Sequence, residues 1–142
     1  MKFIKTIAAS LLFASSLAAA QSHVIVHVAS VHTKAGYNNT NPGIGLRWAD
    51  AHGDGPVAGV YRNSEWRNSA YAGYAWNWQV AGPVSAQFVV GAVTGYKRGT
   101  VVPLVMPSVA YAVGPKTAVR LSGVPPVGSI PGVVHLSFDY KF

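Results

Sequence analysis

Cysteine is absent from this chain of 142 residues, so neither disulfide bonds nor thiol chemistry can stabilise the protein or serve its function. Charge is also scarce, because Asp, Glu, Lys and Arg make up 11% of the residues while apolar residues make up 50%. The surface of a soluble domain normally carries considerably more charge. The composition therefore favours a protein whose outer surface meets lipid.

A long apolar run occurs only at the N-terminus, where it has the features of a secretory signal. Lys2 and Lys5 precede the apolar segment 7–18, which ends in the small residues 18–20. The run is short and rich in small residues for a spanning helix. We predict a cleaved signal peptide at 1–20 and a single domain at 21–142; a retained N-terminal anchor is the alternative.

The end of the chain shows what kind of membrane protein to expect. Apolar and polar side chains alternate there, as on a strand with one lipid-facing and one lumen-facing side. The apolar set is Val134, Leu136, Phe138, Tyr140 and Phe142, and the polar set is His135, Ser137, Asp139 and Lys141. Since only helices and closed barrels satisfy their backbone groups in hydrocarbon, an apolar chain with no further spanning helix predicts a barrel.

Eight segments have strand-like composition and are separated by turn-forming residues. They are 23–33, 43–50, 57–63, 70–78, 84–95, 104–113, 117–123 and 133–142. We therefore predict an all-β fold, an eight-stranded antiparallel up-and-down transmembrane β-barrel in the cell outer membrane. Tyr74, Trp76 and Trp78 share one face and favour the membrane form, as an aromatic girdle. The segments are slightly short for spanning strands, which leaves a thin or a soluble barrel as alternatives.

The balance of charge and motifs limits the possible partners. Without residues 1–20, nine Lys and Arg face four Asp and Glu, and this net charge of +5 favours anionic headgroups or lipopolysaccharide phosphates, or simply aids solubility. The basic residues are scattered, so nucleic acid is not an expected partner. His23 and His27 share a predicted face but have no carboxylate at ligand spacing, and nucleotide-binding glycine loops are absent. We expect no metal and no cofactor.

Five stretches of the chain carry a family resemblance. They read NPGIGLRW at 41–48, VYRNSEWRNS at 60–69, YAGYAW at 71–76, VPLVMPSVAY at 102–111 and VPPVG at 124–128. In this order and spacing they resemble the PagP-type lipid A palmitoyltransferases, over about 24–142. The resemblance implies an outer-membrane barrel with an acyl-binding interior that moves a palmitoyl chain from a phospholipid to lipid A. It also implies outer-membrane lipids, phospholipid and lipid A, as partners; a monomer is expected.

The family uses a His, an Asp and a Ser at its extracellular end, and the resemblance carries these roles onto three positions. Ser64 matches the serine, Asn63 stands where the family has its aspartate, and His27 aligns best with the histidine. If the valines at 24, 26 and 28 face lipid, His27 faces the lumen and His32 the lipid. His32 lies closer to the outer rim and is the fallback.

Acyl transfer explains why such residues would matter. A hydroxyl attacks an ester while a base takes its proton and a fixed donor meets the oxyanion. His27 is the candidate base and Ser64 a donor or positioning group, whereas Asn63 brings no charge. In a serine-protease triad the change from Asp to Asn costs about 10⁴ in rate, so whether the chain is an enzyme stays open.

Prolines complete the resemblance. Pro42, Pro107 and Pro125 match family positions at which a missing strand hydrogen bond opens the wall to lipid. The family's N-terminal amphipathic helix has no counterpart here. The alternatives to an acyltransferase are a non-catalytic outer-membrane barrel with a surface or interaction role, and a secreted soluble barrel that binds a small apolar ligand.

Overall fold

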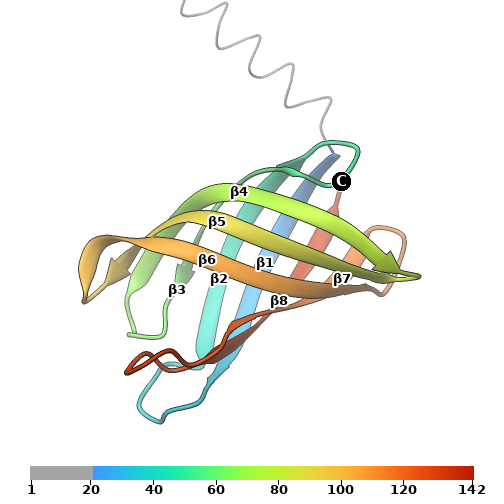
Figure 1. Cartoon of the computed structure of the whole chain (residues 1–142). Coiled ribbons are helices and arrows are strands. Elements are labelled where there is room, and N and C mark those ends of the chain that lie inside the picture. The colour runs from blue at the N-terminus through green and yellow to red at the C-terminus, as the bar shows by residue number, and fades with distance from the viewer. Residues whose placement is uncertain (1–20) are drawn as a thin grey trace, which may run out of the picture.

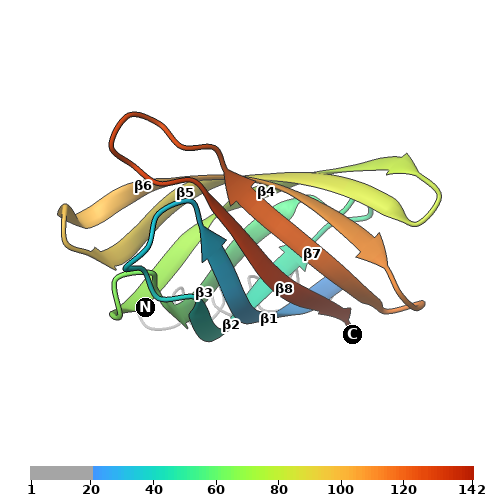
Figure 2. The ribbon, with the colours of Figure 1, turned by 90° about the horizontal axis from the view of Figure 1, so that it is seen from below.

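The computed structural model describes residues 21–142, so the signal peptide predicted at 1–20 lies outside the described residues. The chain forms eight antiparallel strands, each paired with its neighbours in sequence order, and β1 pairs with β8 to close the barrel (Figures 1 and 2). The strands are β1 (Gln21–His32), β2 (Thr40–Ala49), β3 (Gly55–Arg62), β4 (Asn68–Ala81), β5 (Val84–Tyr96), β6 (Gly99–Ala112), β7 (Thr117–Val124) and β8 (Val133–Lys141). The predicted fold class is confirmed.

The alternation of side chains gives the barrel an apolar outside and a polar inside. On β8, Phe138 and Tyr140 are exposed on the outer wall, whereas Ser137 and Asp139 are only 2% and 3% exposed. Exposed apolar side chains occur on every strand, and they include Val26, Ile44, Val60, Trp76, Val90, Val105, Leu121 and Val134. Such a continuous apolar surface is far larger than a soluble monomer shows, and it suits contact with lipid.

Several strands are longer than the sequence predicted. β4 and β6 have 14 residues each and β5 has 13, which exceeds the length of about 9–11 residues that a tilted spanning strand needs. The predicted sixth segment began at 104, but β6 begins at Gly99 and continues through Pro103. Proline is compatible with a strand where its missing N–H faces away from a ladder, as at a sheet edge. Over residues 21–142, the structure contains no helix of the length and apolarity needed to cross a membrane.

The loop lengths set the orientation. The first residue of β1 and the last residue of β8 lie at the same end of the barrel as the connections 50–54, 82–83 and 113–116. The connections 33–39, 63–67, 97–98 and 125–132 lie at the opposite end (Figure 1). Barrels of this kind have short periplasmic turns and longer extracellular loops. We therefore assign the end with 33–39 and 125–132 as the outer end. Trp76, Trp78, Tyr111 and Tyr140, all exposed on the outer wall, lie toward the periplasmic end.

One seam of the wall is incomplete. β5 pairs with β6 along nearly its whole length, from Tyr96↔Gly99 to Val84↔Tyr111. β7 pairs with β6 only from Ser108↔Ser122 to Ala112↔Ala118. The stretch of β6 from 99 to 107 therefore has a backbone ladder on one side alone.

Candidate functional site

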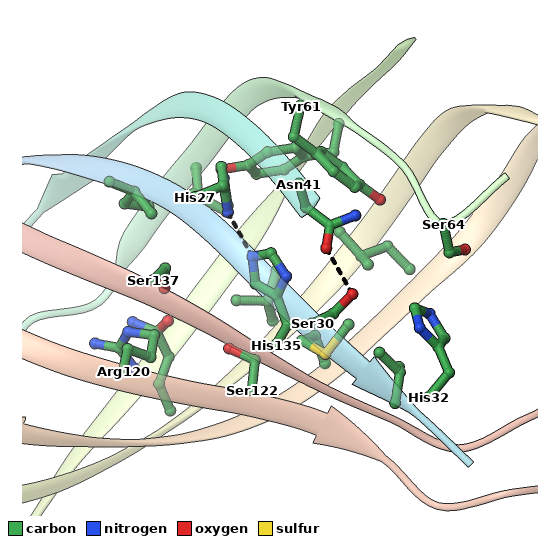
Figure 3. A pocket seen from close by; sticks show the side chains of 18 of the residues that line it. His27, Ser30, His32, Asn41, Tyr61, Ser64, Arg120, Ser122, His135 and Ser137 are labelled. Carbon is green, nitrogen blue, oxygen red and sulfur yellow. Dashed lines mark hydrogen bonds between the residues drawn. The ribbon is translucent and has the colours of Figure 1, made fainter. Parts of the chain in front are cut away.

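A cavity of about 150 Å³ occupies the outer half of the lumen (Figure 3). Its lining mixes apolar side chains with imidazole, phenol and hydroxyl groups. The polar lining residues include His27, His32, Tyr61, Tyr71, Tyr96, Ser30, Ser64 and His135. An engineered cavity of this volume accommodates benzene, whereas pockets for larger ligands measure about 300–1,000 Å³. The cavity therefore has room for a small group only.

His27 lines this cavity, and both of its ring nitrogens have partners. Nδ1 lies 3.0 Å from His135 Nε2, and Nε2 lies 2.9 Å from the hydroxyl of Tyr71 (Figure 3 shows the pair with His135). The His27 ring also packs edge-on against Tyr71, with centroids 5.5 Å apart. A general base needs a nitrogen that accepts the proton it removes, and the hydroxyl that lies next to His27 Nε2 belongs to Tyr71 of the barrel itself. In this arrangement each nitrogen of His27 is already in a hydrogen bond.

Two glycines explain how Tyr71 reaches His27. Gly45, Gly59 and Tyr71 are directly opposite one another on β2, β3 and β4, so their side-chain positions face the same lumen. A Cβ atom on Gly59 would lie 2.7 Å from Tyr71 Cε1 and 2.7 Å from Gly45 Cα. The Tyr71 ring therefore lies across the space that two side chains would otherwise fill.

A β-bulge on β1 corrects the prediction for His32. The register of β1 to both neighbouring strands shifts between His27 and Ala29, so one residue is unpaired. From this point on, the side chains of β1 alternate between lumen and outer wall in the opposite order. Val31 is consequently 70% exposed on the outer wall, while Ser30 is buried and hydrogen bonds Asn41 at 2.5 Å. The prediction that His32 faces lipid is wrong, because its side chain lines the cavity.

Ser64 and Asn63 lie beyond the end of β3, which stops at Arg62. Ser64 lines the same cavity as His27 but lies well apart from it in Figure 3. The predicted third segment, 57–63, included Asn63, whereas the strand ends one residue earlier. Because neighbouring residues of a strand face opposite sides, Asn63 and Ser64 can face one site only beyond the strand end. Whether Ser64 and His27 act together in catalysis stays a prediction.

Asn63 is fully buried and organises the loop 63–67. Its amide nitrogen donates to Ser69 Oγ and to the Gly95 carbonyl, each at 3.0 Å. Its side-chain oxygen accepts the backbone N–H groups of Glu65 and Arg67 at 2.9 and 3.0 Å. An aspartate could accept the two N–H groups but could not donate to the Gly95 carbonyl. The local structure therefore gives the amide a role of its own.

The three prolines occupy different settings. Pro107 is the β6 residue adjoining the point where pairing with β7 ends, and Pro42 adjoins the end of the β2–β3 ladder at Gly43↔Tyr61. Pro125 follows the last residue of β7. Missing donors at Pro42 and Pro107 thus coincide with ladder ends, as expected for proline in a sheet. Their role in lipid access stays a prediction.

A buried ionic group forms the floor of the cavity. Arg120 donates from Nη2 and Nε to Asp139 Oδ2 at 2.7 and 3.0 Å, and from Nη1 to Ser108 Oγ at 2.9 Å. Arg47 Nη2 approaches the same Asp139 oxygen at 3.4 Å. Arg120 lines both this cavity and a second one at the periplasmic end. The group thus separates the two halves of the lumen.

His135, Tyr61 and Tyr71 also line this cavity, although the sequence patterns did not mark them as site residues. The signal for His135 was present, because it lies on the polar face of the last strand. Its proximity to His27 required the pairing of β1 with β8, which spans 108 residues. Within residues 21–142, no three His, Cys, Asp or Glu side chains are grouped so that they could hold a metal ion.

Comparison with known proteins identifies the fold. No family model and no curated protein sequence matches the chain. Among solved structures, it is similar to a de novo designed transmembrane β-barrel, with a TM-score of 0.68 and 16% identity over 87% of this chain and 97% of that one. A second de novo design, solved by NMR in solution, gives 0.63 and 18% over 87% and 94%. The outer membrane protein Ail of Yersinia pestis gives 0.48 and 15% over 87% and 99%.

The designed barrels share the fold with this chain, and identities below 20% show no more than that. The membrane assignment rests on the chain itself, in which a closed wall exposes apolar side chains on all eight strands around a polar lumen. The localisation predicted from the sequence, a multi-pass barrel of the outer membrane, is confirmed at this level. The chain is a small eight-stranded β-barrel of the outer-membrane type.

Proposed function

We propose that this protein is a non-catalytic outer-membrane barrel whose basic outer rim contacts the phosphate groups of lipid A. The observation that carries the proposal is the distribution of charge at the outer end. Five of the nine basic residues from 21 to 142 lie there, and all five are exposed: Lys34, Arg62, Arg67, Lys97 and Arg98. Glu65 is the one acidic residue of the described chain at this end, and its carboxylate accepts the backbone N–H of Lys97.

The position of these cations suits an anionic headgroup layer. Both ion pairs among residues 21–142 involve Asp139, deep in the lumen, so the rim cations are not neutralised by carboxylates. A basic residue close to an anionic membrane surface contributes about 1 kcal/mol of attraction. Beneath the rim, Val60 and Ile44 offer apolar wall to acyl chains. The outer end thus combines the two chemistries that a phosphorylated, acylated lipid presents.

The inner cluster supports a non-catalytic role. His27 has both nitrogens in hydrogen bonds, Asn63 uses its amide within the loop, and the cavity of about 150 Å³ is small for a long acyl chain. His27 and Asn63 are thus each held by contacts within the barrel itself.

The test is binding of fluorescently labelled lipid A, in neutral mixed micelles, to the folded barrel. We expect Arg67→Gln/Lys97→Gln/Arg98→Gln to weaken binding about a hundredfold, and added salt to weaken binding of the wild type. Lys116→Gln/Lys141→Gln, at the periplasmic end, is the control for loss of positive charge and should weaken binding much less. Equal binding by all three proteins, or equal losses in both variants, would overturn the proposal.

A second candidate function is lipid A acyl transfer, as the family resemblance implies. Two observations favour it: His27 and Ser64 line one cavity, and the wall lacks a ladder between β7 and residues 99–107 of β6, next to Pro107. In this alternative His27 takes the proton of the attacking hydroxyl and the open seam admits the acyl chain. It requires the His27 contacts to His135 and Tyr71 to rearrange. It predicts a palmitate-sized mass gain on lipid A that disappears in His27→Ala and in Ser64→Ala.

A further inference from the structure

The periplasmic half of the lumen contains a second cavity, of about 240 Å³, which neither candidate function uses. It is lined by four cationic side chains and one carboxylate, which are Arg47, Arg120, Lys116, Lys141 and Asp139. His23 and His52 also contribute to its lining. The cavity is therefore strongly electropositive, and the surrounding apolar wall strengthens the field within it.

The single carboxylate is committed mainly to one arginine. Asp139 Oδ2 accepts two hydrogen bonds from Arg120, at 2.7 and 3.0 Å, and Arg120 satisfies its remaining nitrogen on Ser108 Oγ. Arg47 approaches the same oxygen only at 3.4 Å. Arg120 is thus well paired, and Arg47 is the cation in excess.

Arg47 is the unusual residue of this group. Its side chain is 4% exposed, and its Nε and Nη1 atoms are buried without a hydrogen-bond partner in the protein. Arg47 lines this periplasmic cavity and not the outer one. A buried guanidinium with unused donors is costly unless an acceptor satisfies them. Its fork of N–H groups matches the geometry of an oxoanion.

The two other carboxylates at this end, Asp50 and Asp54, do not line the cavity. Asp50 accepts the N–H groups of His52 and Asp54 within their own turn, and the hydrogen bond from Asp54 lowers the pKa of the Asp50 carboxyl. Asp54 accepts the N–H of Asn77 at 2.6 Å. Both side chains are engaged by backbone donors, and neither lines the cavity.

We propose that this cavity binds a small oxoanion of the phosphate type, held by Arg47 and attracted by Lys116 and Lys141 at the mouth. The volume admits a tetrahedral oxoanion and falls below that of pockets for drug-sized ligands. The oxoanion is either free in the periplasm or the phosphate group of a lipid from the inner leaflet. This site is at the opposite end of the barrel from the basic rim, so the two proposals can be tested separately.

The experiment uses the folded chain 21–142, which the structure describes, in a neutral detergent. Sodium phosphate is titrated against sodium chloride at constant ionic strength, and binding is followed by calorimetry and by the thermal unfolding midpoint. We expect saturable heat with phosphate and a rising midpoint, because a ligand that binds only the folded state stabilises it. The absence of any phosphate effect beyond that of chloride would overturn the proposal.

Variants locate the site. We expect Lys116→Gln/Lys141→Gln to weaken phosphate binding about tenfold and to leave folding intact, since both residues lie at the mouth. Arg67→Gln/Lys97→Gln removes the same charge from the outer rim and should weaken phosphate binding much less than the lysine pair does. The Arg47→Met protein should not bind phosphate if it folds. If it does not fold, the Lys116→Gln/Lys141→Gln variant still tests the site. Equal weakening by both double variants would overturn the proposed location.

A final arm identifies the source of the anion. Phosphate binding is repeated in nanodiscs of phosphatidylcholine and in nanodiscs containing phosphatidylglycerol. If a lipid headgroup is the occupant, phosphatidylglycerol competes and lowers the apparent affinity for phosphate in the wild type. If free oxoanion is the occupant, the affinity is the same in both membranes. Both results support the site, and they separate its two sources.

Discussion

At the scale of single residues, the amide at 63 has a structural role that an acid could not perform. Asn63→Asp should lose the donations to Ser69 Oγ and to the Gly95 carbonyl, and it would place a carboxylate oxygen against that carbonyl. Burying unsatisfied acceptors costs about 1–3 kcal/mol, so we expect the free energy of unfolding to fall by this amount. Urea unfolding of the folded barrel measures it.

The matched control for this change is Asn68→Asp, because Asn68 is exposed at the start of β4. It adds the same charge at the first residue after the loop 63–67 and should change stability little. If Asn63→Asp were as stable as the wild type, the hydrogen bonds of the Asn63 amide would not be the reason for its presence.

Gly59 allows the next residue-scale prediction. A methyl group at this position would meet Gly45 Cα and the Tyr71 ring, each at 2.7 Å, so Tyr71 must move away from His27. Overpacking of this kind costs about 1–3 kcal/mol, and we expect Gly59→Ala to destabilise the barrel accordingly. Gly114→Ala, which meets nothing within 4 Å, is the control and should be neutral. A neutral Gly59→Ala would show that Tyr71 does not depend on the glycine pair.

At the scale of elements, the open seam between β6 and β7 can be tested by disulfide crosslinking. The chain has no cysteine of its own, so introduced cysteine pairs have no competitor. Ala112 and Ala118 are directly opposite within the ladder, whereas Met106 and Val124 lie beyond its end. Opposed residues of an antiparallel pair have Cα atoms about 4.5–5.5 Å apart, within the range of a disulfide. Ala112→Cys/Ala118→Cys should therefore crosslink on mild oxidation.

The second pair, Met106→Cys/Val124→Cys, should stay reduced under the same conditions, because the strands have separated there. The mass of the oxidised protein and its mobility on a gel report the bond. Rapid crosslinking of the second pair would mean that the seam is closed, and it would remove the observation that favours lateral access for an acyl chain.

The elements also show where sequence reasoning succeeded and where it stopped. The alternation on the last strand predicted its exposed and buried faces, because a strand has a period of two. The same rule failed for His32, since one bulged residue after His27 reverses the facing of every later residue on β1. A bulge depends on the pairing of β1 with both neighbouring strands, and no local pattern in 21–32 specifies it.

The candidate site shows the same limit. The sequence identified His27 as a lumen residue, and its side chain does line the outer cavity. The interpretation of Asn63 as a departure from the family pattern stays a prediction, and the structure shows that this residue is buried. The sequence did not identify His135 and Tyr71 as partners of His27, because these contacts join strands 108 and 44 residues apart in sequence. Patterns of alternation indicate which side a residue faces, but the register of the closed barrel decides which residues meet.

At the scale of the whole molecule, the barrel has two ends with different chemistry. The outer end exposes cations to the surface, and the periplasmic end buries cations around a cavity. The lumen between them is divided by Arg120 and Asp139, so the interior does not form one open channel. The molecule is a closed barrel with a basic outer end and a second cavity at its periplasmic end.

The measurement that tests this account most directly is the mass of lipid A from cells whose outer membrane contains the folded protein and lacks any other palmitoyltransferase. Insertion is verified in the same cells by labelling Lys97→Cys with a membrane-impermeant maleimide, which should react from outside. We predict no palmitate-sized mass gain with the wild type and none with Asn63→Asp. A palmitate-sized gain with the inserted wild type that disappears in His27→Ala would contradict the account and establish an acyltransferase.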